Sequence, residues 1–228
     1  MDFPGLPARL AVVCETVARS QALGGWHHPV RIVGVTKTHG PEAVRAAVAA
    51  GLTDVGENRV QEALQKQEAL TDLTVEWHLI GSLQRNKARN VVGRFGLIHS
   101  VDRADLAAEL NRRVGAGARQ RILVQVNCSA EPQKSGVLPD SLSGLLDELR
   151  LLDRLEVRGL MTMSALTDNQ AEQRRAFRQL RDLRDASERS GYRLPELSMG
   201  MSGDYGIAVE EGATMIRLGT VLFGERSS

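Results

Sequence analysis

A single lysine lies directly after an apolar, β-branched segment near the start of the chain. Residues 30–36 have the sequence Val-Arg-Ile-Val-Gly-Val-Thr, which is typical of a buried parallel strand, and Lys37 follows at once. If that strand belongs to a barrel, Lys37 lies at the mouth formed by the carboxyl ends of the strands, where barrels carry their sites. A lysine partly removed from water can lose its proton and form a Schiff base with an aldehyde. The plainer alternative is a solvated loop lysine.

Two loops late in the chain combine glycines with hydroxyl side chains. Residues 198–204 (Ser-Met-Gly-Met-Ser-Gly-Asp) connect a short apolar strand to a helix start, and Gly219 and Thr220 follow the last apolar strand. Barrels often bind phosphate with the loops after their seventh and eighth strands. Because glycines let the backbone approach an anion and Ser202 offers a further hydroxyl, the two loops together predict a phosphate site.

Three polar residues near the same strand ends have both a plain and a functional interpretation. Arg217 interrupts an apolar strand, so it needs either a salt bridge at the barrel rim or an acceptor atom of a ligand. Asn58 follows a short strand and could contact a ligand ring or cap the next helix. His78 lies on another strand, where it is either a hydrogen-bonded core histidine or a residue of the site.

The sequence does not favour a metal site or a disulfide. His27 and His28 are adjacent and have no cysteine, carboxylate or third histidine at ligand spacing, so we expect no metal site. Cys14 and Cys128 are too few and too far apart for a disulfide scaffold. We therefore expect reduced, idle thiols and a cytoplasmic protein.

Binding to nucleic acid is a weaker alternative. The formal net charge is only +1, from 29 basic and 28 acidic residues, and aromatic residues make up 4% of the chain. Bulk attraction to a polyanion and platforms for base stacking are therefore both scarce. The candidate basic face, which a solvated helix surface also explains, consists of Arg85, Lys87, Arg89 and Arg94.

The elements that must position these residues alternate regularly. Short apolar segments alternate with helical segments along the 228 residues, without a Ser-, Gly- or Pro-rich linker. The expected strands are residues 30–36, 53–57, 75–80, 97–101, 121–126, 155–161, 196–199 and 215–218. The expected helices between them are residues 41–50, 58–69, 83–92, 103–114, 139–152, 169–190 and 204–212.

This alternation predicts a (β/α)8 TIM barrel, with an open, doubly wound sheet as the alternative. We expect one domain over residues 1–228. Only ten residues, 219–228, follow the eighth strand, too few for a full last helix, so we expect the amphipathic segment 6–22 to cover that flank. No apolar run reaches the roughly 18 residues needed to span a bilayer, and residues 1–10 lack the features of a signal peptide. We expect no contact with a membrane.

Several motifs, in order along the chain, resemble those of the pyridoxal phosphate homeostasis protein family. They are Val35–Thr38, Val55–Asn58 with Gln61 and Glu62, His78–Lys87, Leu160–Met163, Leu197–Ser202, Gly212–Thr214, and Arg217–Thr220 with Phe223 and Gly224. The resemblance extends from about residue 30 to residue 226. It implies the barrel fold of the cofactor domain of alanine racemase, binding of pyridoxal 5′-phosphate, and no established catalytic reaction.

The resemblance also implies roles for individual residues. The expected cofactor-binding residues are Lys37, Asn58, His78, Met201, Ser202, Arg217, Gly219 and Thr220. By resemblance Lys37 is the Schiff-base lysine, Arg217 faces the pyridine nitrogen, and Asn58 lies beside the ring. The phosphate cradle would consist of Ser202, Gly219 and Thr220 with the backbone near Met201. Lys134 matches a second lysine of the family, whose role stays open.

Three positions depart from the pattern of the family. Thr36 stands where many members have serine, Arg59 where an aromatic residue is common, and Gly206 where an acidic residue is common. None of them falls on Lys37, on the phosphate loops or on Arg217. Cofactor binding is therefore expected to be intact, and only contacts at the rim or the choice of partner are in doubt.

An arginine beside the ring nitrogen implies weak catalysis. Arginine stays protonated, so it donates to that nitrogen without readily protonating it, whereas enzymes that use the full electron sink place a carboxylate there. We therefore expect no catalytic residues in a monomeric carrier that stores or delivers pyridoxal phosphate in the cell. Its expected partners are the cofactor and, transiently, apo-enzymes that use it.

Two enzymatic alternatives remain. A racemase needs a second base opposite Lys37, and the only tyrosines are Tyr192 and Tyr205. Racemases of this fold take that tyrosine from a further domain, for which we expect no room in this chain. A Schiff-base aldolase acting on a phosphosugar would usually carry its lysine on a later strand and would be colourless.

Overall fold

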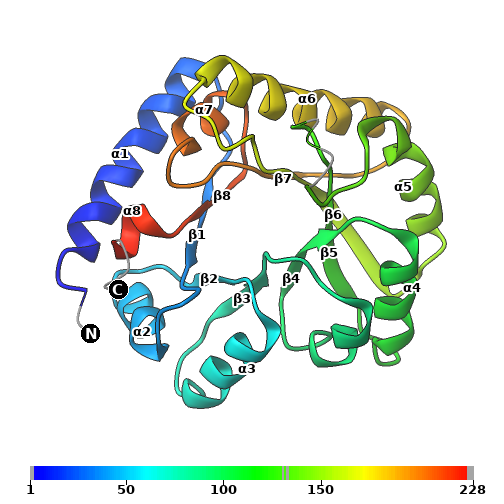
Figure 1. Ribbon diagram of the computed structural model, residues 1–228, viewed down its shortest axis with the longest axis horizontal. Coiled ribbons are helices and arrows are strands. Elements are labelled where there is room, and N and C mark those ends of the chain that lie inside the picture. Colours follow the sequence, from blue (N-terminus) through cyan, green and yellow to red (C-terminus); the bar gives the residue numbers. More distant parts are fainter. Residues whose placement is uncertain (1–2, 130, 132–133, 225–228) are drawn as a thin grey trace.

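Eight parallel strands close into a barrel in the computed structural model, which describes residues 3–129, 131 and 134–224 (Figure 1). The strands follow one another around the barrel in chain order, and β1 pairs with β8 to close it. They are β1 (Arg31–Val35), β2 (Asp54–Glu57), β3 (Glu76–Leu79), β4 (Leu97–Val101), β5 (Gln120–Gln125), β6 (Leu155–Met161), β7 (Glu196–Ser198) and β8 (Met215–Leu218). The predicted (β/α)8 barrel is confirmed.

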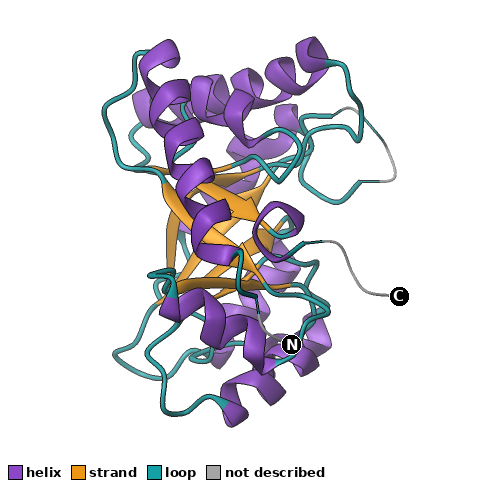
Figure 2. Ribbon diagram, turned by 90° about the vertical axis from the view of Figure 1, so that its left-hand side faces the viewer, coloured by secondary structure: helices purple, strands orange, loops and turns teal. Residues whose placement is uncertain are grey.

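Helices surround the barrel, and Figure 2 shows the strands enclosed between them. They are α1 (Leu6–Gly24), α2 (Pro41–Ala49), α3 (Val60–Ala69), η1 (Arg85–Asn90), α4 (Ala104–Arg113), η2 (Pro139–Ser141), α5 (Leu142–Arg150), α6 (Gln170–Arg189), α7 (Tyr205–Glu210) and α8 (Thr220–Phe223). None of the helices in the described part of the chain is long and apolar enough to cross a bilayer.

Two predicted helices differ from those observed. The segment predicted as a helix over residues 83–92 forms only the 3-10 helix η1, which is rich in arginine and asparagine and is followed by Gly93 in a left-handed conformation. Asparagine has low helix propensity, and left-handed glycine is typical of a chain that leaves a helix. The segment predicted over residues 139–152 begins as the 3-10 turn η2 at Pro139 and becomes α-helical only at Leu142.

The strands direct alternate residues into the barrel and toward the helices. Met215 packs in a small apolar cluster inside the barrel, whereas Ile216 and Leu218 belong to the large cluster under the helices. Residues of a strand that are two positions apart share a face, so Arg217 points inward with Met215. The inner cluster consists of Val33, Leu97, Leu123, Met161 and Met215.

Helix α1 covers the flank of the barrel at β8, as predicted for segment 6–22. It packs against α7 and the short α8, beside which it runs in Figure 1. Leu6 and Val13 are buried there, and Arg9 Nε donates to the carbonyl oxygen of Leu222 over 2.6 Å. The N-terminal helix therefore takes the place that a full last helix would occupy.

Candidate functional site

Most of the predicted site residues come together at one end of the barrel. Because all strands are parallel, the loops that follow them meet at a single mouth. Lys37 follows β1, and Gly219 and Thr220 follow β8, which pairs with β1. Ser202 follows β7, the other neighbour of β8. A carbon at the Cβ position of Gly219 would lie 3.5 Å from the carbonyl oxygen of Val35, two residues before Lys37.

Lys37 is exposed and free in a segment that is otherwise firmly held. It makes no hydrogen bond or ion pair with any residue that the structure describes, whereas both of its neighbours do. Thr36 is fully buried, and its hydroxyl donates to Glu57 Oε1 over 2.5 Å. The backbone N–H of Thr38 donates to Glu62 Oε1 over 2.6 Å. A serine at position 36 would supply the same hydroxyl.

Thr38 adopts a backbone conformation that side chains other than glycine seldom occupy. Its φ is +70°, and no other non-glycine residue described by the structure has a positive φ. Such a residue stores strain that the surrounding contacts must hold in place, and strain of this kind is frequent at functional sites. Here the contacts are the carboxylate of Glu62 and the anchored neighbour Thr36.

A cluster of charged side chains, Lys66, Glu57 and Glu62, binds the backbone of this turn on its buried side. Lys66 of α3 is 3% exposed, and its Nζ donates to the carbonyl oxygen of Thr36 over 2.8 Å. The same ammonium donates to Glu57 Oε1 over 2.6 Å and to Glu62 Oε1 over 3.0 Å. Glu57 is fully buried, and its Oε2 has no partner among the described residues. Burial raises the pKa of the Glu57 carboxyl, although the hydrogen bonds from Lys66 and Thr36 act against it.

The phosphate loops predicted from the sequence face one another. The backbone N–H groups of Gly219 and Val221 both point at Ser202 Oγ, each over 3.3 Å. Thr220 lies between them and is exposed. The backbone N–H groups of Gly219 and Val221 therefore converge with the Ser202 hydroxyl at the end of β8, and an anion that displaces Ser202 Oγ would accept from both N–H groups.

Met201 offers less than the other members of the predicted cradle. Its N–H donates to Asp204 Oδ1 over 2.6 Å, and Ser164 Oγ donates to Asp204 Oδ2 over 2.5 Å. The backbone donor of Met201 is therefore already engaged by a buried carboxylate. Met201 shapes the turn that carries Ser202 rather than presenting a free donor of its own.

Arg217 is a buried cation that forms no ion pair with a residue in the described part of the chain. It is 4% exposed, and its Nη1 donates to Ser198 Oγ over 2.6 Å, while its Nη2 donates to the carbonyl oxygen of Thr162 over 2.9 Å. Burial lowers the pKa of the Arg217 guanidinium to about 10. The salt bridge at the rim, the plain interpretation of this residue, is thus not found. Further N–H groups remain available to an acceptor.

Asn58 lies at the mouth but does not cap the next helix. The N-cap of α3 is Arg59, which also makes no side-chain cap. The backbone of Asn58 passes so close to Gly81 that a Cβ there would lie 2.2 Å from the Asn58 carbonyl oxygen. Gly81 therefore admits the turn that places Asn58 beside the end of β3.

His78 lies in the barrel interior and takes the arrangement of a core histidine. It is fully buried, its Nδ1 lies 2.9 Å from His99 Nε2, and its Nε2 lies 3.0 Å from Asp54 Oδ1. Both ring nitrogens are thus engaged, and the structure does not bring His78 to the mouth with Lys37.

Lys134 lies in the segment after β5, close to the loops that follow β6 and β7. Its Nζ donates to the carbonyl oxygen of Ser164 over 2.8 Å, and it pairs with Glu131. A hollow of about 460 Å³ lies beside it and reaches Met201 and Asp204. Its neighbours Pro132 and Gln133 lie outside the described residues.

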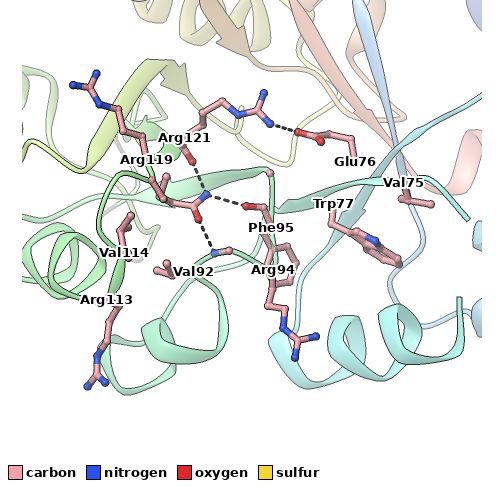
Figure 3. Close-up of a pocket in the computed structure, with 15 residues that line it drawn as sticks. Val75, Glu76, Trp77, Val92, Arg94, Phe95, Arg113, Val114, Arg119 and Arg121 are labelled. Carbon is pink, nitrogen blue, oxygen red and sulfur yellow. Dashed lines mark hydrogen bonds and ion pairs between the residues drawn. The ribbon is translucent and has the colours of Figure 1, made fainter. Parts of the chain in front are cut away.

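A second hollow, of about 410 Å³, lies at the other end of the barrel, where β3, β4 and β5 begin (Figure 3). Arg121 pairs with Glu76 across it. The guanidinium groups of Arg94, Arg113 and Arg119 point in different directions in Figure 3. Because these cations diverge, the hollow offers no convergent anion site.

The sequence analysis did not identify the residues that hold the turn that carries Lys37, namely Lys66, Glu57 and Glu62. Lys66 and Glu62 stand four residues apart on one helix face, a spacing that signals an ion pair. Nothing in the sequence indicates that Glu57 joins them. No group of three or more histidine, cysteine, aspartate or glutamate residues suited to a metal occurs in the part of the chain described. Cys14 is exposed and Cys128 is buried.

The chain is similar to proteins named pyridoxal phosphate homeostasis protein and, in fold, to alanine racemases. The family model described as alanine racemase, N-terminal domain, matches residues 18–227. A protein of Aquifex aeolicus named pyridoxal phosphate homeostasis protein is 44% identical over 96% of this chain and 97% of its own, and one of Pseudomonas aeruginosa with the same name is 41% identical over 95% and 97%. The solved structure of PipY from Synechococcus elongatus with PLP bound is 42% identical, with a TM-score of 0.84 over 96% of this chain and 100% of PipY. Alanine racemase of Clostridium difficile shares the fold, with a TM-score of 0.79 at 15% identity over 100% of this chain and 62% of the racemase.

Proposed function

The chain belongs to the pyridoxal phosphate homeostasis protein family, and from this premise we propose that it binds pyridoxal 5′-phosphate at the mouth of its barrel and serves in homeostasis of that cofactor. One observation carries the proposal. Arg217, which is buried, and Lys37 form no ion pair with any residue that the structure describes, and they lie at the same mouth as the converging donors of Gly219, Val221 and Ser202. The relative PipY, 42% identical, supports it, since its structure was solved with PLP bound.

The residues of the mouth are complementary to three groups of the cofactor: its aldehyde, its ring nitrogen and its phosphate. An amine can attack the aldehyde, and the ring nitrogen and the phosphate accept hydrogen bonds. Lys37 is the amine nucleophile, because its side chain makes no hydrogen bond or ion pair with a described residue and its backbone is fixed on both sides. Ser202, Gly219 and Thr220 bind the phosphate through hydroxyls and backbone N–H groups. Arg217 donates to the ring nitrogen from within the barrel.

The same residues favour holding the cofactor over using it in catalysis. Arg217 remains a donor near neutral pH, because its pKa of about 10 is still well above neutrality. It therefore does not readily protonate a ring nitrogen, and strong electron withdrawal by the ring needs that proton. Of the two tyrosines, Tyr192 precedes β7 and so lies at the end of the barrel away from the mouth, whereas Tyr205 is the first residue of α7, beside the loop that carries Ser202. We propose a carrier that stores or delivers the cofactor.

The test of binding is direct. The purified protein is incubated with pyridoxal phosphate, its absorption spectrum is recorded, and the bound cofactor is reduced with borohydride and located by mass spectrometry. We expect a yellow protein with the cofactor on Lys37. The variant Lys37→Ala should lose the absorption band, and Lys87→Ala on η1, a matched control, should keep it. A protein that stays colourless, or that carries the cofactor on another lysine, would refute the proposal.

Two further assays separate the carrier from the enzymatic alternatives. With L-alanine in deuterated water, the loaded protein should exchange the α-hydrogen far more slowly than the roughly 1–1000 turnovers per second typical of enzymes. Turnover in that range would establish a racemase. For delivery, cofactor transfer from the loaded protein to an apo-enzyme should exceed the rate from an equal concentration of free cofactor, and an equal rate would argue against active delivery.

A further inference from the structure

Three aromatic rings from separate parts of the chain meet near the end of β1. Phe3 precedes α1, His39 follows β1, and Phe223 is the last residue of α8. The ring centroids lie 5.5 Å apart for Phe3 and His39, 5.6 Å for Phe3 and Phe223, and 5.8 Å for His39 and Phe223. These separations are typical of favourable aromatic pairs, and both pairs that include Phe3 are edge-to-face. Each ring of this aromatic cluster therefore contacts the other two.

Two rings of the aromatic cluster belong to the segments that carry the proposed site. The backbone N–H of His39 donates to the carbonyl oxygen of Thr36 over 3.1 Å, which closes the turn that contains Lys37. The N–H of Phe223 donates to the carbonyl oxygen of Gly219 over 2.9 Å, which joins Phe223 to the segment that faces the phosphate. The aromatic cluster thus connects the turn that carries the amine with the helix that follows the phosphate donors.

The two segments differ in how the rest of the barrel holds them. The turn after β1 is anchored on its buried side by Lys66 and Glu62. Helix α8 spans only Thr220–Phe223, and so short a helix is not stable without contacts from other elements. Ser202 Oγ accepts from two backbone N–H groups at the start of α8, and a bound phosphate would take over these same groups. Once the phosphate is bound, α8 therefore depends on contacts other than Ser202.

The segment at the start of α1 supplies two such contacts, and α1 and α8 lie side by side in Figure 1. The ring of Phe3 packs against that of Phe223. Arg9 Nε donates to the carbonyl oxygen of Leu222 over 2.6 Å. The last carbonyl groups of a helix have no partner within it, and a cation is favourable at that end. A Cβ at Gly5 would lie 2.6 Å from Arg9 Nη1, so the glycine leaves room for the guanidinium.

We propose that Phe3 and Arg9 are positioning residues, which hold α8 so that the N–H groups at its start face the phosphate of the cofactor. The proposal rests on the proposed function, because it takes the phosphate to bind beside α8. It adds that a segment outside the mouth sets the affinity for one end of the cofactor. Because Lys66 and Glu62 hold the turn with Lys37 independently, loss of Phe3 or Arg9 weakens phosphate binding and leaves attack on the aldehyde unchanged.

The size of the effect depends on the fraction of molecules in which α8 is in place. A ligand that binds only that arrangement has an apparent dissociation constant inversely proportional to this fraction. An aromatic pair shifts such an equilibrium roughly twofold to tenfold, and independent losses multiply. Because α8 is too short to hold itself, we expect it to leave its place in most molecules once both contacts are removed.

The first experiment uses the unliganded protein. Amide hydrogen exchange, measured by NMR, reports the opening of α8 through the N–H groups of its last two residues, which both donate to backbone carbonyl oxygen. In Phe3→Ala/Arg9→Met, we expect these amides to exchange roughly tenfold faster than in the wild type.

The matched control is Trp26→Ala, which loosens the other end of α1. Trp26 follows that helix, and its Nε1 donates to a carbonyl oxygen at the end of α7 over 2.8 Å. Exchange in α8 should stay as in the wild type. The proposal would be overturned if Phe3→Ala/Arg9→Met left this exchange unchanged, or if Trp26→Ala accelerated it as much.

The second experiment compares pyridoxal phosphate with pyridoxal, which has the same aldehyde and ring but no phosphate. Binding of each is titrated by the absorption of the Schiff base. In Phe3→Ala/Arg9→Met, we expect the dissociation constant of pyridoxal phosphate to rise roughly tenfold and that of pyridoxal less than about twofold. Phe3→Ala and Arg9→Met alone should each show part of the effect. A general loss of stability would weaken both ligands alike, so this selectivity separates a positioning role from a structural one.

Failure of the proposal and failure of the proposed function give different results. If the wild type binds neither ligand, the proposed function fails, and the proposal fails with it. If the wild type binds pyridoxal phosphate on Lys37 and the double variant binds it equally well, only the proposal fails. The same holds if the double variant loses affinity for both ligands equally. Selective loss of affinity for pyridoxal phosphate supports both.

Discussion

Replacement of Lys66 by methionine tests whether the buried ion cluster holds the turn that carries Lys37. Methionine keeps most of the length of the side chain but removes the ammonium. Three hydrogen bonds are lost, to Glu57, to Glu62 and to the carbonyl oxygen of Thr36. Glu57 is then left fully buried with the Thr36 hydroxyl as its remaining donor among the described residues.

The expected loss of stability is large because one partner of a buried pair disappears while the other stays. Such changes cost about 3–5 kcal/mol. For a chain of this size each kcal/mol lowers the melting temperature by roughly 2–4 °C, so Lys66→Met should melt roughly 6–20 °C below the wild type. The double variant Lys66→Met/Glu57→Gln leaves neither of the two buried charges of this cluster and should recover most of the loss.

The loss should also depend on pH in a defined direction. The pKa of Glu57 is raised in the folded protein, so the native state binds more protons than the unfolded state between the two pKa values. Stability therefore falls as pH rises through that interval. Without the charge and hydrogen bond of Lys66, the folded pKa rises further and the interval widens. The deficit of Lys66→Met should grow with increasing pH and shrink toward about pH 4, where a glutamate is protonated in the unfolded chain as well.

Urea unfolding over a series of pH values measures both effects. The matched control is Lys87→Met, a half-buried lysine of η1, which should change the free energy of unfolding by less than about 0.5 kcal/mol. A deficit for Lys66→Met that is independent of pH would contradict the reasoning. The reasoning would also be contradicted if Lys66→Met/Glu57→Gln were no more stable than Lys66→Met. Removal of the unpaired Glu57 carboxylate would then have had no stabilising effect.

Two other predictions concern the phosphate loop and the cysteines. Gly200→Ala should lower the free energy of unfolding, measured in urea, by about 1–3 kcal/mol, because Gly200 has φ +95° and an added Cβ would lie 2.6 Å from the Cβ of Ala208. The control is Gly203→Ala, whose added Cβ meets nothing within 4 Å. Equal losses of stability in the two variants would refute this account. An aromatic disulfide reagent should label Cys14 in the native protein and Cys128 only after denaturation, because Cys128 is buried and its pKa is raised to about 11. Rapid labelling of both thiols in the native protein would contradict that burial.

Much of the barrel and of its mouth could be predicted from local patterns. The strands at residues 97–101, 155–161 and 215–218 agree with the observed bounds, because apolar runs of that length between helical segments are strong signals. Once the strands are parallel, the residues that follow them must share one end. Lys37, Ser202 and Gly219 could therefore be grouped without coordinates.

Local patterns were weakest where a residue has two good interpretations. The sequence left Asn58 as a helix cap or a ligand contact, and His78 as a core or a site residue. Helix α3 begins one residue too late for Asn58 to be its cap, and His78 finds both of its partners inside the barrel. These choices depend on a helix start and on cross-barrel neighbours, neither of which hydrophobic periodicity reports.

The sequence by itself determined the fold class, the end of the barrel that carries the site, and the residue types available there. Only the tertiary structure decided which buried polar groups meet. Ser198 and His99 are 99 residues apart, and Lys66 reaches the carbonyl oxygen of a residue 30 positions earlier. These contacts exist because barrel closure and strand register bring inward-facing side chains of different strands to the same height. A buried polar group must find its partner in that arrangement, and its own neighbours in sequence do not reveal which partner it will be.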